Sequence, residues 1–190
     1  MAKIILVTGG ARSGKSAFAE KLALSSGERV GYIATAEVRD PEMSHRVELH
    51  RKRRPGDWVT YEAPAGAEAV VAEAAGVAGF LLFDCLTIYT SNQLLSFPEG
   101  EGFGRRTEVI LKNTERLIGA AQSFPGTVVF VTNEVGDGIV PENRLAREFR
   151  DIAGLVNQRV AEAAEEVYWV VCGLPVEVKK PALHITGGRH

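Results

Sequence analysis

Hydrophobic positions along the chain gather in short, nearly continuous runs separated by longer segments of mixed character. Five runs stand out: "IILVTGG" (4–10), "VGYIATA" (30–36), "GFLLFDCL" (79–86), "TVVFVTNEV" (127–135) and "VYWVVCGL" (167–174). Strands that are buried on both faces have this pattern, because neither face alternates with polar side chains. The runs therefore predict the strands of a central, mostly parallel sheet.

The segments between the runs have the spacing of amphipathic helices. Helices are expected over 14–25, 64–76 and 105–123, and most clearly over about 144–165. In the last segment the apolar side chains recur at steps of three and four residues: Leu145, Phe149, Ile152, Val156, Val160 and Ala163. Alternation of strands and helices predicts an α/β fold with right-handed crossovers and helices flanking the sheet.

Two segments depart from this alternation. Residues 91–104, "SNQLLSFPEGEGFG", are rich in Gly, Pro and Glu and are expected to be irregular. Residues 177–190 are expected to hold a final strand and a tail. A chain of 190 residues is most simply one domain, so we predict a single domain over 1–180 and a C-terminal tail over 181–190.

Composition narrows the classes of function. The chain is 45% hydrophobic and 24% charged with a net charge of −2, which is typical of a soluble globular protein and argues against nucleic-acid binding by bulk charge. Cys85 and Cys172 are too few for a disulfide scaffold and lie outside any CxxC pattern. No apolar run approaches the ~20 residues that span a bilayer, and no signal peptide is evident. We therefore expect a cytoplasmic protein without a membrane span.

A phosphate-binding loop follows the first run. Residues 9–16, "GGARSGKS", fit the pattern G-x-x-x-x-G-K-[ST] between a predicted strand and a predicted helix. Glycines let backbone N–H groups turn toward phosphate oxygens, and the helix presents its positive end to the anion. Lys15 is expected to reach the β- and γ-phosphates, and Ser16 to bind Mg²⁺. The nucleotide-binding residues predicted here are Gly9, Gly10, Ala11, Arg12, Ser13, Gly14, Lys15 and Ser16. The order strand, loop, helix argues against a chance match in a Gly-rich loop, and predicts a P-loop NTPase-type domain.

Asp84 ends the third run, where a P-loop domain needs a second carboxylate. In that position it resembles the Walker B residue that binds Mg²⁺ directly or through water, and we predict that Asp84 contacts both metal and nucleotide. The alternative is a carboxylate that caps a helix beginning near residue 86.

One short segment concentrates positive charge. Residues 43–55, "MSHRVELHRKRRP", hold two of the four histidines and five of the 22 Lys and Arg residues. If 42–53 is a helix, Met43, Val47 and His50 share one face. A solvated helix face and a nucleic-acid patch are both possible interpretations. The mild net acidity and the lack of a second basic patch weaken the second.

Four stretches together resemble one enzyme family. They are "ILVTGGARSGKS" (5–16), "YIATAE" (32–37), "RVELHRKRRPGDW" (46–58) and the long block 131–179 that begins "VTNEVGDGIVPENR". Their order and content resemble the bifunctional adenosylcobinamide kinase/adenosylcobinamide-phosphate guanylyltransferase family over nearly the whole chain. The resemblance implies a P-loop α/β domain, assembly as a homotrimer, and adenosylcobinamide and its phosphate as substrates.

The resemblance also implies two reactions. A nucleoside triphosphate, ATP or GTP, phosphorylates the aminopropanol hydroxyl of adenosylcobinamide. GTP then transfers GMP to that phosphate through a guanylyl-histidine, giving adenosylcobinamide-GDP and pyrophosphate. His50 is the better match to the family's histidine and His45 the alternative; this chain carries Leu49 where some members have a further histidine. Lys15 and His50 are thus the predicted catalytic residues.

Further nucleotide contacts follow from the same matching. They are expected from Thr35, Ala36, Glu37, Arg51, Lys52, Arg53 and Arg54. Glu62 is a candidate for base or ribose recognition, since a carboxylate accepts hydrogen bonds from guanine N1–H and N2–H₂; a plain surface carboxylate is the alternative. Residues 133–144 should face the same side of the sheet, beside a corrin pocket or a subunit contact.

Two other functions compete with the bifunctional enzyme. The first is a simple P-loop kinase of a small molecule, in which His50 is structural. The second is a nucleic-acid-dependent ATPase that uses the basic run 51–54. The sequence leaves open which nucleotide the kinase prefers, whether both reactions share one nucleotide site, and which residues hold the corrin.

Overall fold

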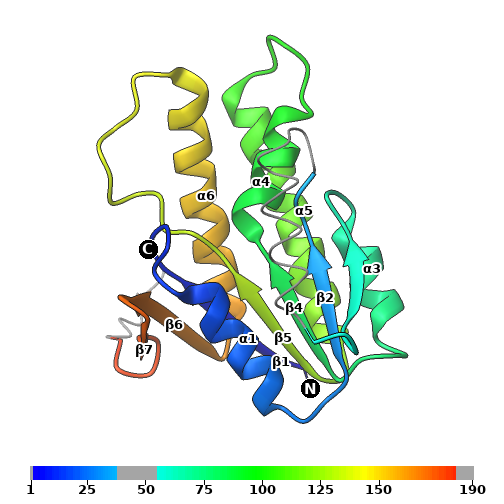
Figure 1. Ribbon diagram of the computed structural model, residues 1–190. Coiled ribbons are helices and arrows are strands. Elements are labelled where there is room, and N and C mark those ends of the chain that lie inside the picture. The colour runs from blue at the N-terminus through cyan, green and yellow to red at the C-terminus, as the bar shows by residue number, and fades with distance from the viewer. Residues whose placement is uncertain (1, 38–54, 183–190) are drawn as a thin grey trace, which may run out of the picture.

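The computed structural model describes residues 2–37 and 55–182. Within these ranges the chain forms a seven-stranded sheet in the order β3-β2-β4-β5-β1-β6-β7 (Figure 1). The strands are β1 (Lys3–Thr8), β2 (Val30–Ala34), β3 (Val59–Glu62), β4 (Phe80–Asp84), β5 (Thr127–Val131), β6 (Glu166–Val171) and β7 (Leu174–Glu177). Neighbouring strands are parallel except β7, which runs antiparallel to β6. The predicted α/β fold with a mostly parallel sheet is confirmed.

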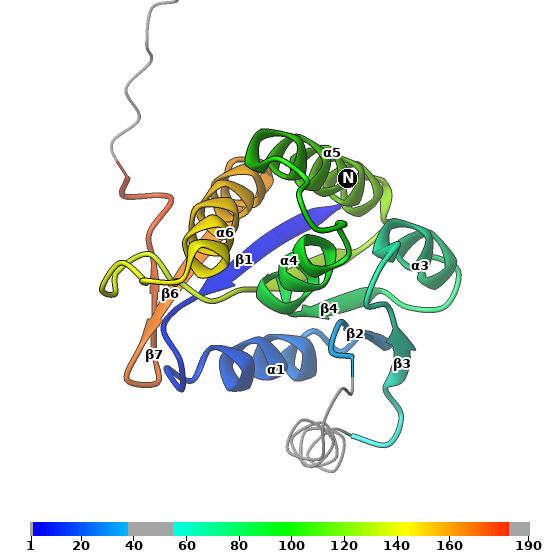
Figure 2. The same cartoon turned by 90° about the horizontal axis from the view of Figure 1, so that it is seen from above.

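Helices cover both faces of the sheet. The described helices are α1 (Lys15–Ser25), α3 (Ala67–Ala74), α4 (Leu86–Leu95), α5 (Phe103–Ser123) and α6 (Arg144–Ala163). Seen from above, α1 lies on one face and the other four on the opposite face (Figure 2). None of the helices in the described part of the chain is long and apolar enough to cross a membrane.

Side chains alternate between two apolar cores, as the period of two in a strand requires. In β1, Ile5 and Val7 face α1, whereas Ile4 and Leu6 face the layer of α3, α5 and α6. Because β1, β2, β4 and β5 are covered on both faces, these strands are apolar along most of their length. That is why they were recognisable as continuous runs.

A third cluster holds α4, α5 and α6 together. Leu94, Ile110, Ile152 and Val156 are buried in it. Beside it the carboxylate of Glu148, in α6, accepts a hydrogen bond from Arg106 of α5 at 3.0 Å. The apolar periodicity predicted for the last helix is confirmed at Ile152, Val156 and Val160.

Three details differ from the sequence-based expectation. The strand β3 was not predicted, because its half-exposed pattern at the sheet edge lacks a continuous apolar run. Residues 91–95 are not irregular: they complete α4, where Leu94 is buried between α5 and α6. The last described strand ends at Glu177 instead of beginning there. The division into 1–180 and 181–190 stays a prediction.

The sheet brings the carboxyl ends of several strands to one edge. Ala34 is paired with Asp84, and Asp84 with Val131, while Val7 is paired with Val131 from the other side. The segments that follow β1, β2, β4 and β5 therefore begin side by side. Ligands of open α/β sheets bind at such an edge.

Candidate active site

The loop over 9–16 joins β1 to α1 as the sequence predicts. The N-cap residue of α1 is Gly14 with φ +97°, so the helix begins at Lys15. Within the loop the N–H of Ser13 donates to the carbonyl oxygen of Gly10 at 3.2 Å. The first N–H groups of α1 have no partner within the helix, and they give this end of the helix the positive potential that binds anions.

Two glycines let the loop lie close to its neighbours. A Cβ atom on Gly9 would lie 2.5 Å from the carbonyl oxygen of Val170. A Cβ atom on Gly14 would lie 3.0 Å from the Cα atom of Gly173. Glycine is required at both positions because of this packing, which is separate from any contact with phosphate.

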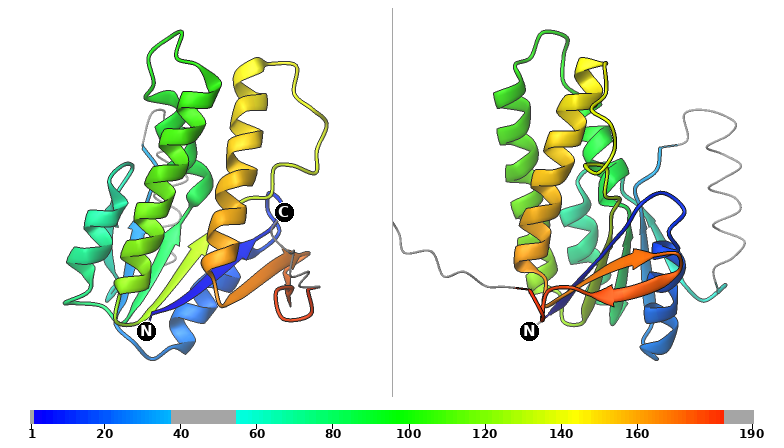
Figure 3. Two further views of the ribbon diagram at one scale, coloured as in Figure 1. Left: turned by 180° about the vertical axis from the view of Figure 1, so that it is seen from behind. Right: turned by 90° about the vertical axis from the view of Figure 1, so that its left-hand side faces the viewer.

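The turn of the β6–β7 hairpin braces the loop from the side. Its central residues, Cys172 and Gly173, both have positive φ, as a two-residue type I′ turn requires. The N–H of Gly173 donates to the carbonyl oxygen of Ser13 at 2.7 Å, and Figure 3 (right) shows the turn reaching the loop. We did not predict this contact from the sequence; a Cys-Gly pair between two apolar stretches was the available indication of the turn.

Lys15 is buried at the start of α1, with 8% of its surface exposed. Its Nζ donates to the carbonyl oxygen of Gly10 at 3.0 Å. Burial lowers the pKa of the Lys15 ammonium, while nearby Cys85 and Asp84 act in the opposite direction. A partly desolvated cation of this kind interacts strongly with phosphate oxygens.

Asp84 lies at the end of β4 on the same face as α1. Phe80 and Leu82 belong to the core on the α1 side, and Asp84 continues that alternation. Its Oδ2 accepts a hydrogen bond from the hydroxyl of Tyr32 at 2.9 Å. The N-cap of α4 is Cys85, without a side-chain hydrogen bond, so Asp84 is not the N-cap of this helix.

The thiol of Cys85, next to Asp84 in the chain, is unreactive at neutral pH. Burial, followed by the charge of Asp84, raises the pKa of Cys85 to about 11. Because a thiol reacts as its thiolate, Cys85 is a packing residue at neutral pH.

The oxygen donors at this edge fit a magnesium ion. Ser16 supplies a hydroxyl and Asp84 a carboxylate, and hard oxygen ligands are those that Mg²⁺ prefers. In the described residues no group of three or more His, Cys, Asp or Glu side chains gathers as a metal cage. Nucleotide-bound Mg²⁺ needs no such cage, since phosphates and water complete its shell. Two buried hydroxyl oxygens at the loop, on Thr8 and Ser13, lack a hydrogen-bond partner in the described part of the chain. A bound ligand is one explanation of such atoms.

Thr35 links the ends of β2 and β4. Its side chain is fully buried, and its Oγ1 accepts from the N–H of Cys85 at 2.8 Å and donates to the carbonyl oxygen of Cys85 at 2.9 Å. The side-chain amide of Asn92, in α4, donates to the carbonyl oxygens of Thr35 and Pro64. The hydroxyl of Thr35 is thus engaged with backbone, while Ala36 is half-buried at the same edge.

The remaining predicted residues fall into two groups. Glu37 follows β2 at the site edge and Glu62 ends β3, two strands from β4. His50, His45, Arg51, Lys52, Arg53 and Arg54 lie outside the described residues. The structure therefore brings together the phosphate loop, Thr35 and Asp84, and leaves the histidine assignment as a prediction.

A polar network that sequence reasoning missed fixes the segment after β5. The Oγ1 of Thr87, in α4, accepts from the N–H of Asn133 at 2.7 Å. Thr132 donates to Asn157 of α6 at 2.7 Å, and the Asn157 amide donates to the carbonyl oxygen of Asn133 at 3.2 Å. No motif marks these residues, because they meet only when α4, α6 and β5 pack.

The segment after β5 also contacts the phosphate loop. The N–H of Glu134 donates to the carbonyl oxygen of Gly9 at 3.1 Å. Further along, Arg147 and Arg150 of α6 donate to carbonyl oxygens of this segment. Its tip is exposed and apolar: Ile139 has 97% of its surface accessible. The prediction that this segment faces the site side is confirmed for its first residues.

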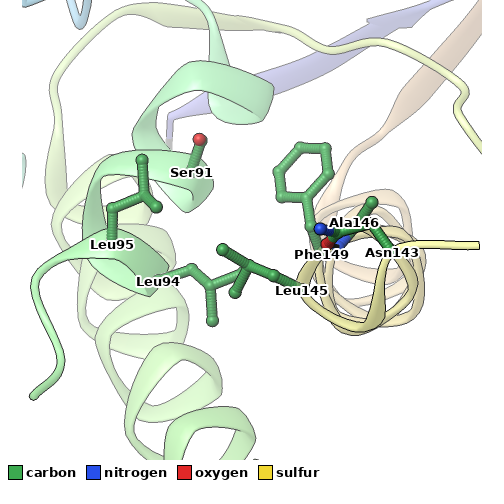
Figure 4. A pocket seen from close by; sticks show the side chains of 7 residues that line it. All are labelled: Ser91, Leu94, Leu95, Asn143, Leu145, Ala146 and Phe149. Atoms are coloured by element: carbon green, nitrogen blue, oxygen red, sulfur yellow. Dashed lines mark hydrogen bonds between the residues drawn. The ribbon is translucent and has the colours of Figure 1, made fainter. Parts of the chain in front are cut away.

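A small cavity of about 240 Å³ opens between α4 and the first turns of α6. Its lining is mostly apolar, with Leu94, Leu95, Leu145 and Phe149 around it (Figure 4). Ser91 and Asn143 add polar groups.

Comparison with known proteins agrees with this geometry. A family model described as cobinamide kinase / cobinamide phosphate guanyltransferase matches residues 5–178. The chain belongs to this family. The bifunctional adenosylcobalamin biosynthesis protein CobU of Salmonella typhimurium is 45% identical over 181 residues, covering 93% of this chain and 99% of that protein. The CobU protein of Escherichia coli is 44% identical over 181 residues, with the same coverage. The bifunctional protein CobP of Pseudomonas aeruginosa is 42% identical over 174 residues, covering 92% of this chain and 96% of that protein.

Membership of the cobinamide kinase / cobinamide phosphate guanyltransferase family confirms the resemblance inferred from the motifs. The protein is a bifunctional kinase and guanylyltransferase of cobalamin biosynthesis. The matched range contains the phosphate loop, Asp84 and the basic segment around His50.

Proposed function

We propose that this protein first phosphorylates the aminopropanol hydroxyl of adenosylcobinamide with ATP or GTP, and then transfers GMP from GTP to the new phosphate. The products of the second step are adenosylcobinamide-GDP and pyrophosphate. The observation that carries the proposal is the buried side chain of Lys15 at the start of α1, near Asp84, within a chain that belongs to the cobinamide kinase family. No nucleic acid takes part, and the cytoplasmic location expected from the sequence stays a prediction.

In the kinase step Lys15 and the backbone N–H groups of the phosphate loop hold the triphosphate. Phosphoryl transfer depends chiefly on positioning and on stabilising charge on the phosphoryl oxygens. Lys15 suits the second task, because its side chain is buried at the start of α1 and its ammonium is partly desolvated. Ser16 and Asp84 would hold Mg²⁺, which when bound neutralises the charge of the phosphates.

In the guanylyl step we assign the nucleophile to His50. A neutral imidazole nitrogen forms a bond to the α-phosphorus of GTP, and the bond from that phosphorus to the bridging oxygen breaks to release pyrophosphate. A phosphate oxygen of adenosylcobinamide phosphate then displaces the histidine and takes GMP. The cluster Arg51, Lys52, Arg53 and Arg54 favours the neutral imidazole and attracts the triphosphate. Thr35, Ala36 and Glu37 border the nucleotide, and Glu62 takes part in recognition of the base or the ribose.

The alternative is a simple kinase without nucleotidyl transfer, and isotope labelling separates the two. The protein is incubated with Mg²⁺ and GTP labelled at the α- or the γ-phosphorus, and then denatured. We expect covalent α-label that is acid-labile and alkali-stable. The label should disappear in His50→Ala and persist in His45→Ala, its matched control. Absence of α-label from the unmodified protein would overturn the guanylyl-histidine.

The kinase half has its own test. Lys15→Ala should abolish phosphorylation of adenosylcobinamide, while His50→Ala should retain it. An unimpaired rate in Lys15→Ala would contradict the role of the phosphate loop.

We also propose that the protein assembles as a homotrimer, as the family resemblance implies. The β6–β7 hairpin supports an interface of this kind. Two cross-strand pairs, Trp169 with Val176 and Val171 with Leu174, consist of exposed apolar side chains. Exposed apolar patches of this sort mark protein contacts in soluble proteins.

A further inference from the structure

The tyrosine of β2 is buried against the carboxylate at the end of β4. Tyr32 has 3% of its surface exposed, and its hydroxyl donates to Oδ2 of Asp84 at 2.9 Å. Its backbone is paired with Leu82, two residues before Asp84 on the neighbouring strand. Tyr32, Leu82 and the Asp84 carboxylate therefore lie on the face of the sheet that α1 covers.

The tyrosine ring is held by its surroundings. Tyr32 packs within the core on the α1 side, together with Val30 and Leu82. The indole of Trp58 stacks on it, with ring centroids 6.5 Å apart and an interplanar angle of 27°. Side chains in a close-packed core sit in rotamer minima, so the packing of this ring restricts where the phenol hydroxyl lies. The hydroxyl of Tyr32 can therefore hold its hydrogen-bond partner in one orientation.

The partner of this hydroxyl is the carboxylate of Asp84, whose orientation matters for binding a metal ion. The hydrogen bond of a phenol to a carboxylate is charge-assisted and stronger than a neutral one. It occupies Oδ2 and restricts rotation of the Asp84 carboxyl group about its last bond. Lys15 lies on the same side, near enough to Asp84 that the carboxylate charge opposes the lowering of the Lys15 pKa by burial.

We propose that Tyr32 is a positioning residue for Asp84: its hydroxyl fixes one carboxylate oxygen so that the other serves the Mg²⁺–nucleotide complex. The proposal rests on the metal role of Asp84 proposed above. Tyr32 touches neither nucleotide nor metal in this scheme. Residues that orient a metal-binding carboxylate in this way commonly change metal affinity about 10- to 100-fold when they are removed.

The test is Tyr32→Phe, which removes the hydroxyl and keeps the ring. Nucleotide binding is measured by calorimetry at a series of Mg²⁺ concentrations and in EDTA. We expect the Mg²⁺ concentration for half-maximal enhancement of binding to rise about 10-fold or more. Affinity in EDTA should stay within about twofold of the unmodified protein, because the phosphate loop itself is unchanged. An unchanged Mg²⁺ requirement would overturn the proposal, and so would an equal loss of affinity in EDTA.

Tyr168→Phe is the matched control. The hydroxyl of Tyr168 also donates to a carboxylate oxygen at 2.9 Å, on Glu166 at the opposite end of the strands. Removing it deletes the same kind of hydrogen bond without touching the site. The Mg²⁺ requirement of this variant should equal that of the unmodified protein. If Tyr168→Phe raises the Mg²⁺ requirement as much as Tyr32→Phe does, the effect does not depend on Asp84, and the proposal is overturned.

A variant of the carboxylate separates the inference from the function on which it rests. Asp84→Ala should raise the Mg²⁺ requirement at least as much as Tyr32→Phe, and the double variant should be no worse than Asp84→Ala alone. If Asp84→Ala leaves the requirement unchanged, the metal role of Asp84 fails. If Asp84→Ala raises it and Tyr32→Phe does not, only the positioning role of Tyr32 fails.

Discussion

Gly173 donates its backbone N–H to the carbonyl oxygen of Ser13 at 2.7 Å. The bond joins the turn of an edge hairpin to the middle of the phosphate loop, although the two lie at opposite ends of the sequence. The loop is therefore supported by the hairpin as well as by β1 and α1. Two residues with positive φ, Cys172 and Gly173, create the turn that makes the contact.

The first prediction concerns the contact between the hairpin turn and the phosphate loop. In Gly173→Ala, an added Cβ meets no atom within 4 Å, but a side chain at φ +81° costs about 1–2 kcal/mol of strain, and we expect this strain to weaken the contact of the turn with Ser13. Gly27→Ala is the control, since Gly27 has φ +70°, open space around it and no contact with the loop. Chemical denaturation should show similar losses of stability in both variants. Calorimetry should show weaker nucleotide binding in Gly173→Ala alone, and equal affinities would contradict the brace.

The second prediction concerns Thr35. Thr35→Val keeps the shape of the side chain but leaves the N–H of Cys85 without its partner, which costs about 1–3 kcal/mol of stability. Thr35→Ser should restore most of this loss. Thr114→Val is the control, because within the described residues the buried hydroxyl of Thr114 donates to the carbonyl oxygen of Ile110 in its own helix. Urea denaturation that finds equal losses in both valine variants would refute the link between β2 and β4.

The third prediction concerns pH. Burial lowers the pKa of Lys15 below the 10.5 of an ordinary lysine, so the unfolded chain binds this proton more tightly than the folded protein does. The lowered pKa of Lys15 therefore reduces the free energy of unfolding at neutral pH. This loss is recovered as the pH rises from the pKa of the folded state toward 10.5. The stability of the unmodified protein relative to Lys15→Met should increase over that range, measured by denaturation between pH 7 and 10.5.

Two further measurements make the pH prediction specific. Lys21→Met removes an exposed lysine from the same helix and corrects for the general loss of a cation. A relative stability that falls with rising pH would contradict the sign of the shift. Nucleotide binding should weaken at alkaline pH, because Lys15 loses its proton earlier than an ordinary lysine and with it the attraction to phosphate.

The fourth prediction concerns assembly. Trp169→Lys places a charge in the middle of the exposed apolar pairs of the hairpin, so the proposed trimer should dissociate to monomers. Leu24→Lys is the control, since Leu24 is an exposed apolar residue of α1 away from the hairpin. Size-exclusion chromatography with light scattering measures the mass of each. A trimer that persists in Trp169→Lys would exclude this face as the interface.

The elements that the sequence predicted well are those specified by their own residues. Strands β1, β2, β4 and β5 are covered on both faces, so each is largely apolar and visible as a run. Strand β6 is visible as a run too, although its Trp169 and Val171 are exposed. The phosphate loop is equally local, because one short segment supplies the glycines, Lys15 and Ser16. The strand β3 escaped prediction since it lies at the sheet edge with Thr60 and Glu62 exposed. The helix α4 was not among the predicted helices, and its last residues were expected to be irregular, because Ser91 and Asn92 look like loop residues until their packing is known.

The sequence by itself therefore determined the fold class, the phosphate loop, the carboxylate Asp84 and the enzyme family, because each rests on short local stretches and on their order along the chain. Only the tertiary structure decided which side chains support that chemistry. Tyr32 and Asp84 are 52 residues apart, and Thr35 and Cys85 are 50 apart, yet each pair meets because β2 and β4 are adjacent in the sheet. Hydrogen bonds of this kind depend on strand order and register, which local patterns do not encode.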